Sequence, residues 1–146
     1  MSALAVATVL VSGFVGGAEF ASATLVHPVI RRLEPDAQLV MEKGLLRTFG
    51  RVMPVGMTAA AVLAGILAGR EPSPLLVVAA VVLVVALVVT IAGNVPINIR
   101  TGRIREQQAP EGFLEMRRRW DVFQLIRGSL QLLGFVLVVC GTVGAA

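Results

Sequence analysis

The sequence predicts an all-α fold, an integral membrane four-helix bundle with antiparallel helices, and three observations support this prediction. First, 56% of the 146 residues are hydrophobic and only 15% are charged, and the mean hydropathy is +0.85. These values are typical of multi-pass membrane proteins rather than soluble domains. Second, the chain has four apolar runs, each long enough to cross about 30 Å of hydrocarbon as a helix. Third, the basic residues gather in two of the three connections between these runs.

The four predicted spans cover residues 4–29, 52–68, 75–93 and 122–143. We expect residues 1–146 to form a single transmembrane domain, because the chain shows no convincing internal repeat. The first run differs from a secretion signal, since no basic residue precedes its apolar core and its length of about 26 residues exceeds that of a signal core. We therefore expect the first run to stay in the mature protein as a span.

The basic residues predict the orientation of the bundle. Residues 31–51 hold five Lys or Arg side chains and residues 100–119 hold six, whereas the connection "GREPSP" holds only Arg70. The positive-inside rule predicts that both basic connections are cytoplasmic and that the N and C termini lie outside the cell membrane. The net charge of +4 does not indicate a nucleic-acid partner, because these residues flank spans and no aromatic-interleaved basic patch accompanies them. The expected partner is the lipid bilayer.

Small residues predict close helix packing. The first span carries Gly13 and Gly17 at GxxxG spacing, and the second carries Gly65 and Gly69 at the same spacing. Such pairs let helix backbones approach one another closely in membranes. We expect these faces to pack within the bundle or to support a homo-oligomer.

Two polar segments are predicted to extend the second and fourth spans. Asp36 can cap an interfacial helix that Pro54 then kinks where the chain enters the membrane. Pro110 and Glu111 can start a helix that continues unbroken into the fourth span. Trp120 would then lie at the level of the lipid headgroups, where aromatic belts form.

Several polar side chains interrupt the apolar runs. At a rise of 1.5 Å per residue they all fall in the cytoplasmic half of the bilayer. Polar groups at membrane depth are costly and commonly functional, so this shared depth predicts a polar pocket open to the cytoplasm. The polar residues are Glu19 and His27 in the first span, Asn94 and Asn98 around the end of the third, and Gln124, Arg127 and Gln131 in the fourth.

The fourth span carries three of these residues on one stripe. Gln124, Arg127 and Gln131 follow an i, i+3, i+7 pattern, and Trp120 precedes them by one turn. Each of Glu19 and Arg127, left ionised and separate, would cost about 2.5 to 3.5 kcal/mol at the centre of a span. Glu19 can therefore pair with Arg127 or remain protonated, and the pair can serve chemistry or only fix helix register.

The stretch "GNVPINIR" predicts a disturbed backbone at the end of the third span. Pro96 lacks an N–H group and frees backbone groups beside Asn94 and Asn98, which lie on one helix face. Two interpretations fit this pattern, a helix terminus at the membrane interface or a kink that faces a substrate.

Two motifs resemble a known family. "NVPINIR", followed after a basic loop by "RRRWDVFQLIRGSLQLLGF", resembles the paired signature N-x-P-x-N and W-x-x-x-[NH]-x-x-R of the four-helix membrane family that includes the anthrone oxygenases. Gln124 stands where His or Asn is common in that signature. The Val-His-Pro end of the first span and "FGRVMPVGM" also fit the family, so we expect the resemblance to extend over nearly the whole chain. The matched positions are Asn94, Pro96, Asn98, Trp120 and Arg127.

The resemblance implies oxygenation, by O₂, of an anthrone or a related lipophilic aromatic polyphenol without a metal or flavin. Such a substrate reduces O₂ itself once deprotonated, so the protein needs only a base, oxyanion donors and a dry pocket. We expect His27 or Glu19 to be the base. The expected catalytic residues are Glu19, His27 and Arg127, and the expected substrate-binding residues are Asn94, Asn98, Trp120, Gln124 and Gln131.

The composition also bounds the alternatives. One histidine and one cysteine cannot build an intramolecular two-histidine or multi-cysteine metal site, so we predict no metal and no cofactor. A small proton-coupled transporter of lipophilic compounds is the main rival, and a non-catalytic membrane structural protein is another. The single-signed charge bias and the cationic Arg127 both argue against transport of a lipophilic cation.

Overall fold

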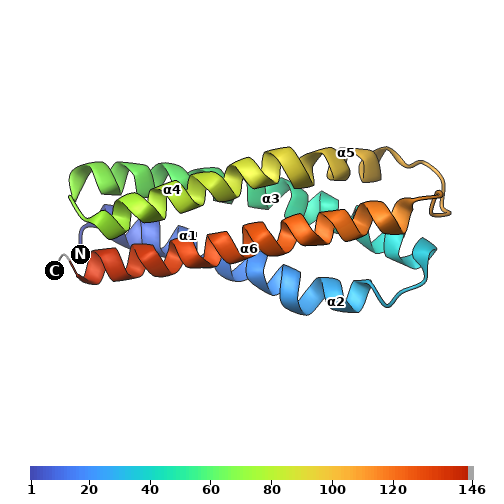
Figure 1. Ribbon diagram of the computed structural model, residues 1–146, viewed down its shortest axis with the longest axis horizontal. Coiled ribbons are helices and arrows are strands. Elements are labelled where there is room, and N and C mark those ends of the chain that lie inside the picture. Colours follow the sequence, from blue (N-terminus) through green and yellow to red (C-terminus); the bar gives the residue numbers. More distant parts are fainter. Residues whose placement is uncertain (145–146) are drawn as a thin grey trace.

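The computed structural model describes residues 1–144, and its architecture is four helical rods (Figure 1). Within these residues the secondary structure is entirely helical. The first rod joins α1 (Ala3–Ala21), the π-helical segment η1 (Ser22–Val26) and α2 (His27–Ile30). The second rod is α3 (Pro35–Arg70), and the third joins α4 (Pro74–Val89), the π-helical η2 (Thr90–Asn94) and α5 (Val95–Arg103). The fourth rod is α6 (Phe113–Val143).

This arrangement confirms the predicted all-α four-helix membrane fold. Four helices are long and apolar enough to cross a membrane. Both termini lie at the same end of the bundle as the α3–α4 connection, whereas the two basic connections lie at the opposite end (Figure 1). The termini therefore share one side of the bundle, and the assignment of that side to the outside of the cell remains a prediction.

The helices extend beyond the predicted spans at the end with the basic connections. α3 continues through Pro54 as one α-helix, so the predicted interfacial helix is the first part of a single long helix. α6 likewise runs unbroken into its apolar part, as predicted, but it begins at Phe113 after Gly112, whose φ is 78°. Pro110 and Glu111 therefore precede α6, and the expectation that they start it was wrong.

Asp36 does not cap α3. Glu34 occupies the N-cap position, and Asp36 lies in the first turn, where its carboxylate cannot act as the cap. Asp36 Oδ1 instead accepts a hydrogen bond of 2.7 Å from the backbone N–H of Ala109. This bond fastens the start of α3 to the α5–α6 connection, so the two basic connections are joined at one end of the bundle.

Close packing of α1 on α6 involves Gly13, one of the predicted glycines, together with two others. A Cβ atom added at Gly13 would lie 2.9 Å from the ring of Phe135 on α6. A Cβ atom added at Gly16 would lie 2.9 Å from the backbone oxygen of Gln131, and one added at Gly128 would lie 3.0 Å from the backbone oxygen of Glu19. Gly17, Gly65 and Gly69 have no such neighbour within 4 Å among the described residues. The α1–α6 contact therefore includes Gly13 but not Gly17 of the predicted pair in α1, and self-association through the open glycines remains a prediction.

The two π-helical segments lie at corresponding places in the first and third rods. Each ends two residues before a proline, Pro28 in the first rod and Pro96 in the third. The N–H groups of His27 and Val95 bond to the carbonyls of Ser22 and Thr90, five residues back. A proline cannot make the i→i−4 bond and clashes with that carbonyl, and a wide turn relieves both problems.

Candidate active site

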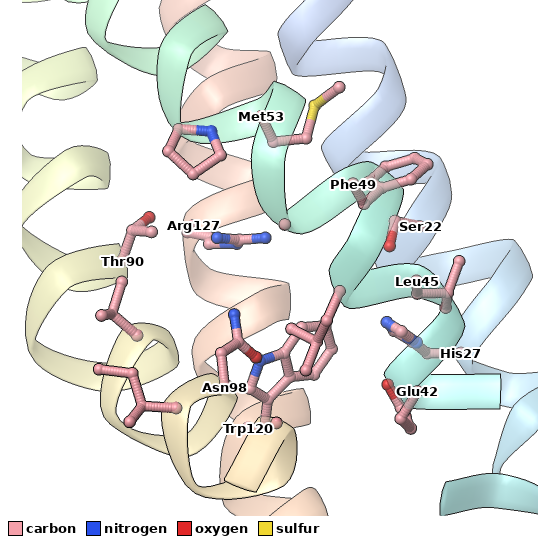
Figure 2. Close-up of a pocket in the computed structure, with 16 residues that line it drawn as sticks. Ser22, His27, Glu42, Leu45, Phe49, Met53, Thr90, Asn98, Trp120 and Arg127 are labelled. Carbon is pink, nitrogen blue, oxygen red and sulfur yellow. The ribbon is translucent and has the colours of Figure 1, made fainter. Parts of the chain in front are cut away.

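A cavity of about 350 Å³ lies between α2, α3, α5 and α6, next to the π-helical segments (Figure 2). This volume falls within the range of small-molecule pockets. Much of the lining is apolar and comes from α3 and α5, including Leu46, Phe49, Met53 and Ile99. The polar lining includes His27, Glu42, Asn98, Trp120 and Arg127.

The apolar wall also locates the opening of the cavity. Ile99 on α5 keeps 48% of its surface exposed, and Phe49 on the facing part of α3 is half-buried. Met53, farther along α3, is buried. The cavity therefore opens between α3 and α5, through a gap lined with hydrophobic side chains.

Trp120 is the central side chain of the polar wall. Its ring meets the imidazole of His27 edge to face, with the ring centroids 4.4 Å apart and an interplanar angle of 85°. The guanidinium carbon of Arg117 lies 4.3 Å from the ring centroid, and that of Arg127 lies 5.9 Å away. The quadrupole of an indole ring stabilises nearby cations, so Trp120 helps to hold both arginines.

The indole also fixes the orientation of Asn98. Trp120 Nε1 donates a hydrogen bond of 2.7 Å to Asn98 Oδ1. An indole N–H can only donate, so the carboxamide must present its oxygen to Trp120 and its NH₂ group elsewhere. In Figure 2 the nitrogen of Asn98 turns away from the indole, on the side of Arg127. Asn98 is therefore an N–H donor available to the cavity.

Arg127, Glu19 and Gln124 are joined pairwise by side-chain hydrogen bonds. Arg127 Nη2 donates to Glu19 Oε2 at 2.8 Å, and Arg127 Nε donates to Gln124 Oε1 at 2.6 Å. Gln124 Nε2 in turn donates to Glu19 Oε2 at 2.7 Å. All three side chains are buried. Because Arg127 lines the cavity, these hydrogen bonds fix a guanidinium group at the cavity wall.

A second buried ion pair lies on the other side of Trp120. Arg117 Nη2 donates to Glu42 Oε2 at 2.6 Å, and the two residues are only 2% and 4% exposed. Arg117 was expected only as one of the orienting charges, and Glu42 was not among the predicted site residues. The spacing does indicate that Glu42 is buried, because it lies one turn after Gln38 and Leu39 on the buried face of α3. The polar residues on either side, however, make this part of α3 resemble a helix exposed to solvent.

A family profile described as anthrone oxygenase matches residues 38–137. The chain belongs to the anthrone oxygenase family. This confirms the family that the two motifs indicated. No curated protein and no solved structure matches the chain. The matched range includes the α5 and α6 motifs but not Glu19 and His27, so it is narrower than the nearly complete resemblance we expected.

In this anthrone oxygenase family member, the predicted site residues separate into two groups. His27, Asn98, Trp120 and Arg127 line the cavity. The other four are buried outside its lining: Glu19, Asn94, Gln124 and Gln131. Of the two candidate bases, His27 is thus the one that reaches the cavity, and its Nδ1 atom is buried without a hydrogen-bond partner in residues 1–144.

Three of the four residues outside the lining, all but Gln131, form hydrogen bonds to residues that line the cavity. Asn94 Nδ2 donates to the backbone oxygen of Trp120 at 3.3 Å and so connects η2 to α6. Gln131 is fully buried beside Gly16, and neither Nε2 nor Oε1 of its amide has a hydrogen-bond partner in the described chain.

Within residues 1–144, no group of three or more His, Cys, Asp or Glu side chains is placed to hold a metal ion.

Proposed function

We propose that this protein is a cofactor-independent oxygenase of the cell membrane that converts an anthrone, or a related lipophilic polyphenol, into a quinone with O₂. The proposal rests on one observation: the imidazole of His27 and two N–H donors, Asn98 and Arg127, line the same largely apolar cavity. Membership of the anthrone oxygenase family supports the same reaction class. The apolar opening between α3 and α5 suits a substrate that partitions into lipid.

The proposed reaction begins with proton transfer. His27 takes a proton from the methylene carbon of the anthrone, and the negative charge spreads onto the ketone oxygen. Arg127 and Asn98 donate hydrogen bonds to that oxygen, which stabilises the anion in a site of low polarity. Because Glu19 and Gln124 already hold Arg127, little reorganisation is needed when the charge develops.

The remaining steps need only O₂. The carbanion passes electrons to O₂ and a carbon–oxygen bond forms. The resulting peroxide anion takes back the proton held by His27, and the hydroperoxide then loses water to leave a carbonyl group. Overall, CH₂ and O₂ become C=O and H₂O, so atoms and electrons balance. The substrate supplies all the electrons, and for this reason the proposal includes neither a metal nor a flavin.

The test is O₂ uptake by the purified protein in lipid vesicles with an added anthrone, after subtraction of the uptake by protein-free vesicles. We expect one quinone per O₂ consumed. His27→Gln should lower this rate by roughly 100-fold or more, since general-base catalysis contributes about 10² to 10⁴. Cys140→Ser, at an exposed position far along α6, is the matched control and should retain the rate.

Two results would reject the proposal. One is a His27→Gln protein that oxidises anthrone at the rate of the unaltered protein. The other is anthrone accumulation in vesicles under a pH gradient without quinone formation, which would indicate a transporter.

A further inference from the structure

A second cleft, of about 280 Å³, lies outside the candidate active site at the end of the bundle with the basic connections. It lies where the end of α2 and the start of α3 meet the first part of α6 (Figure 1). This volume has room for a group much larger than a water molecule. We call it the arginine cleft, and it is lined by Arg31, Gln38, Leu114, Arg117, Arg118 and Asp121.

The charges at the arginine cleft leave one positive charge uncompensated. Arg31 Nη1 lies 3.1 Å from Asp121 Oδ2, and Arg117 Nη2 lies 2.6 Å from Glu42 Oε2. Arg118 is exposed and forms no ion pair within residues 1–144. The three arginines therefore exceed the two carboxylates by one charge. This excess matches the single negative charge of a phosphodiester group.

Arg117 supplies hydrogen-bond donors that the described chain does not use. The residue is 2% exposed, and its Nε and Nη1 atoms have no hydrogen-bond partner in residues 1–144. A buried donor without an acceptor costs free energy, and the cost is larger for a charged group. The guanidinium is also held in place, because Nη2 bonds to Glu42 and the carbon lies 4.3 Å from the ring centroid of Trp120. An anionic oxygen would satisfy these donors.

We propose that the arginine cleft binds the phosphate group of an anionic phospholipid, in the leaflet on the side of the basic connections. Arg31, Arg117 and Arg118 donate hydrogen bonds to the phosphate oxygens. Arginine suits this role because its planar guanidinium matches the geometry of a phosphate. Basic pockets between membrane spans bind lipid headgroups in the same way. This binding site does not depend on the proposed function.

Apolar surface next to the arginine cleft favours a lipid over a phosphate ion from solution. One face of α6 continues from the cleft toward the apolar part of the helix, with residues three or four positions apart: Leu114, Arg118, Asp121 and Leu125. Leu125 keeps 50% of its surface exposed, and Val29, two residues before Arg31 on the first rod, keeps 61%. The acyl chains can therefore lie along exposed hydrophobic side chains while the phosphate lies among the arginines.

Lipid retention by the purified protein tests the proposal. The protein in neutral detergent is incubated with equal amounts of phosphatidylglycerol and phosphatidylcholine that carry the same acyl chains, and native mass spectrometry counts the lipids retained. We expect one phosphatidylglycerol per chain, favoured roughly five-fold or more, since one basic residue near an anionic lipid contributes about that factor. Excess inorganic phosphate should not displace it. Equal retention of the two lipids, or displacement by phosphate, would overturn the proposal.

Two matched variants separate the arginine cleft from general attraction to anionic lipid. Arg118→Gln and Arg105→Gln each remove one exposed charge at the same end of the bundle, but Arg105 does not line the cleft. Arg118→Gln should lower the retention of phosphatidylglycerol about five-fold. Arg105→Gln should leave it unchanged. An equal loss in both variants would mean that basic residues attract the lipid without a specific site, contrary to the proposal.

A double variant tests the buried arginine at constant net charge. Arg117→Met with Glu42→Met removes one charge of each sign and leaves no buried charge of this pair without its partner. Retention of phosphatidylglycerol should then fall toward that of phosphatidylcholine, with thermal unfolding as the check on folding. Undiminished retention in a folded double variant would show that the headgroup binds elsewhere and would reject the site.

Discussion

Asn98 accepts the indole N–H of Trp120 at 2.7 Å, and this hydrogen bond joins the α5 motif to the α6 motif across the candidate site. The two residues come from separate rods and are brought together beside the cavity. Each side chain thereby gives the other a hydrogen-bond partner beside the cavity.

The energy of this bond can be measured with a double-mutant cycle. We expect Trp120→Phe and Asn98→Leu each to lower stability, because the first leaves the half-buried amide of Asn98 without this partner and the second does the same to the buried indole N–H of Trp120. The coupling between them should be about 1 kcal/mol. Thermal unfolding in detergent of both single variants and the double variant gives this value. Strict additivity would mean that the two side chains do not bond in the folded protein.

Glu19→Gln should destabilise the protein strongly, because it leaves the charge of Arg127 buried without a counter-ion. Breaking a buried pair by changing one partner typically costs about 3 to 5 kcal/mol. Changing both residues to Met should restore much of the stability while abolishing anthrone oxidation. The measurements are thermal unfolding and O₂ uptake on the same samples. An active double variant would show that Arg127 is not an oxyanion donor.

Adjacent glycines of α1 should respond in opposite ways to alanine. Gly16→Ala places a Cβ atom 2.9 Å from the backbone oxygen of Gln131, so α1 and α6 must separate, and we expect a loss of about 1 to 3 kcal/mol. Gly17→Ala meets nothing within 4 Å and should be neutral or stabilising by about 0.5 to 1 kcal/mol. Thermal unfolding compares the two. Equal effects would contradict the close approach of these helices.

Single-cysteine labelling can test the predicted orientation. In a Cys140→Ser background, Gln107→Cys lies in the α5–α6 connection and Pro72→Cys lies in the α3–α4 connection, at opposite ends of the bundle. A membrane-impermeant maleimide should label Pro72→Cys in intact cells and Gln107→Cys only in inverted vesicles. The reverse pattern would place the termini in the cytoplasm.

The sequence predicted the helices well because their signal is simple. Long apolar runs and clustered basic residues leave few alternatives to a helical bundle. Helix ends were harder to predict. Asp36 is a residue type that commonly caps helices, yet the N-cap of α3 is Glu34, two residues earlier, and Asp36 instead bonds to Ala109. A one-dimensional pattern does not contain that tertiary contact.

The candidate site could be predicted in part for the same physical reason. Polar residues within apolar runs are conspicuous, so the stripe of Gln124, Arg127 and Gln131 was visible. Depth alone did not separate Arg127, which lines the cavity, from Gln131, which does not. Glu42 was missed because it lies among other charged residues near the start of α3, where a buried carboxylate and an exposed one look alike in sequence.

The wide turns η1 and η2 make the site depend on the number of residues in each rod. A π-helical turn resembles an α-helical turn that has taken in one additional residue. If the same residues formed a regular α-helix, the additional residue would no longer be taken up in η1, and every later side chain would rotate by about 100° about the helix axis. His27 would then leave the cavity although no residue that lines it had been changed. The chemistry of this bundle is therefore encoded in its residue spacing as well as in its side chains.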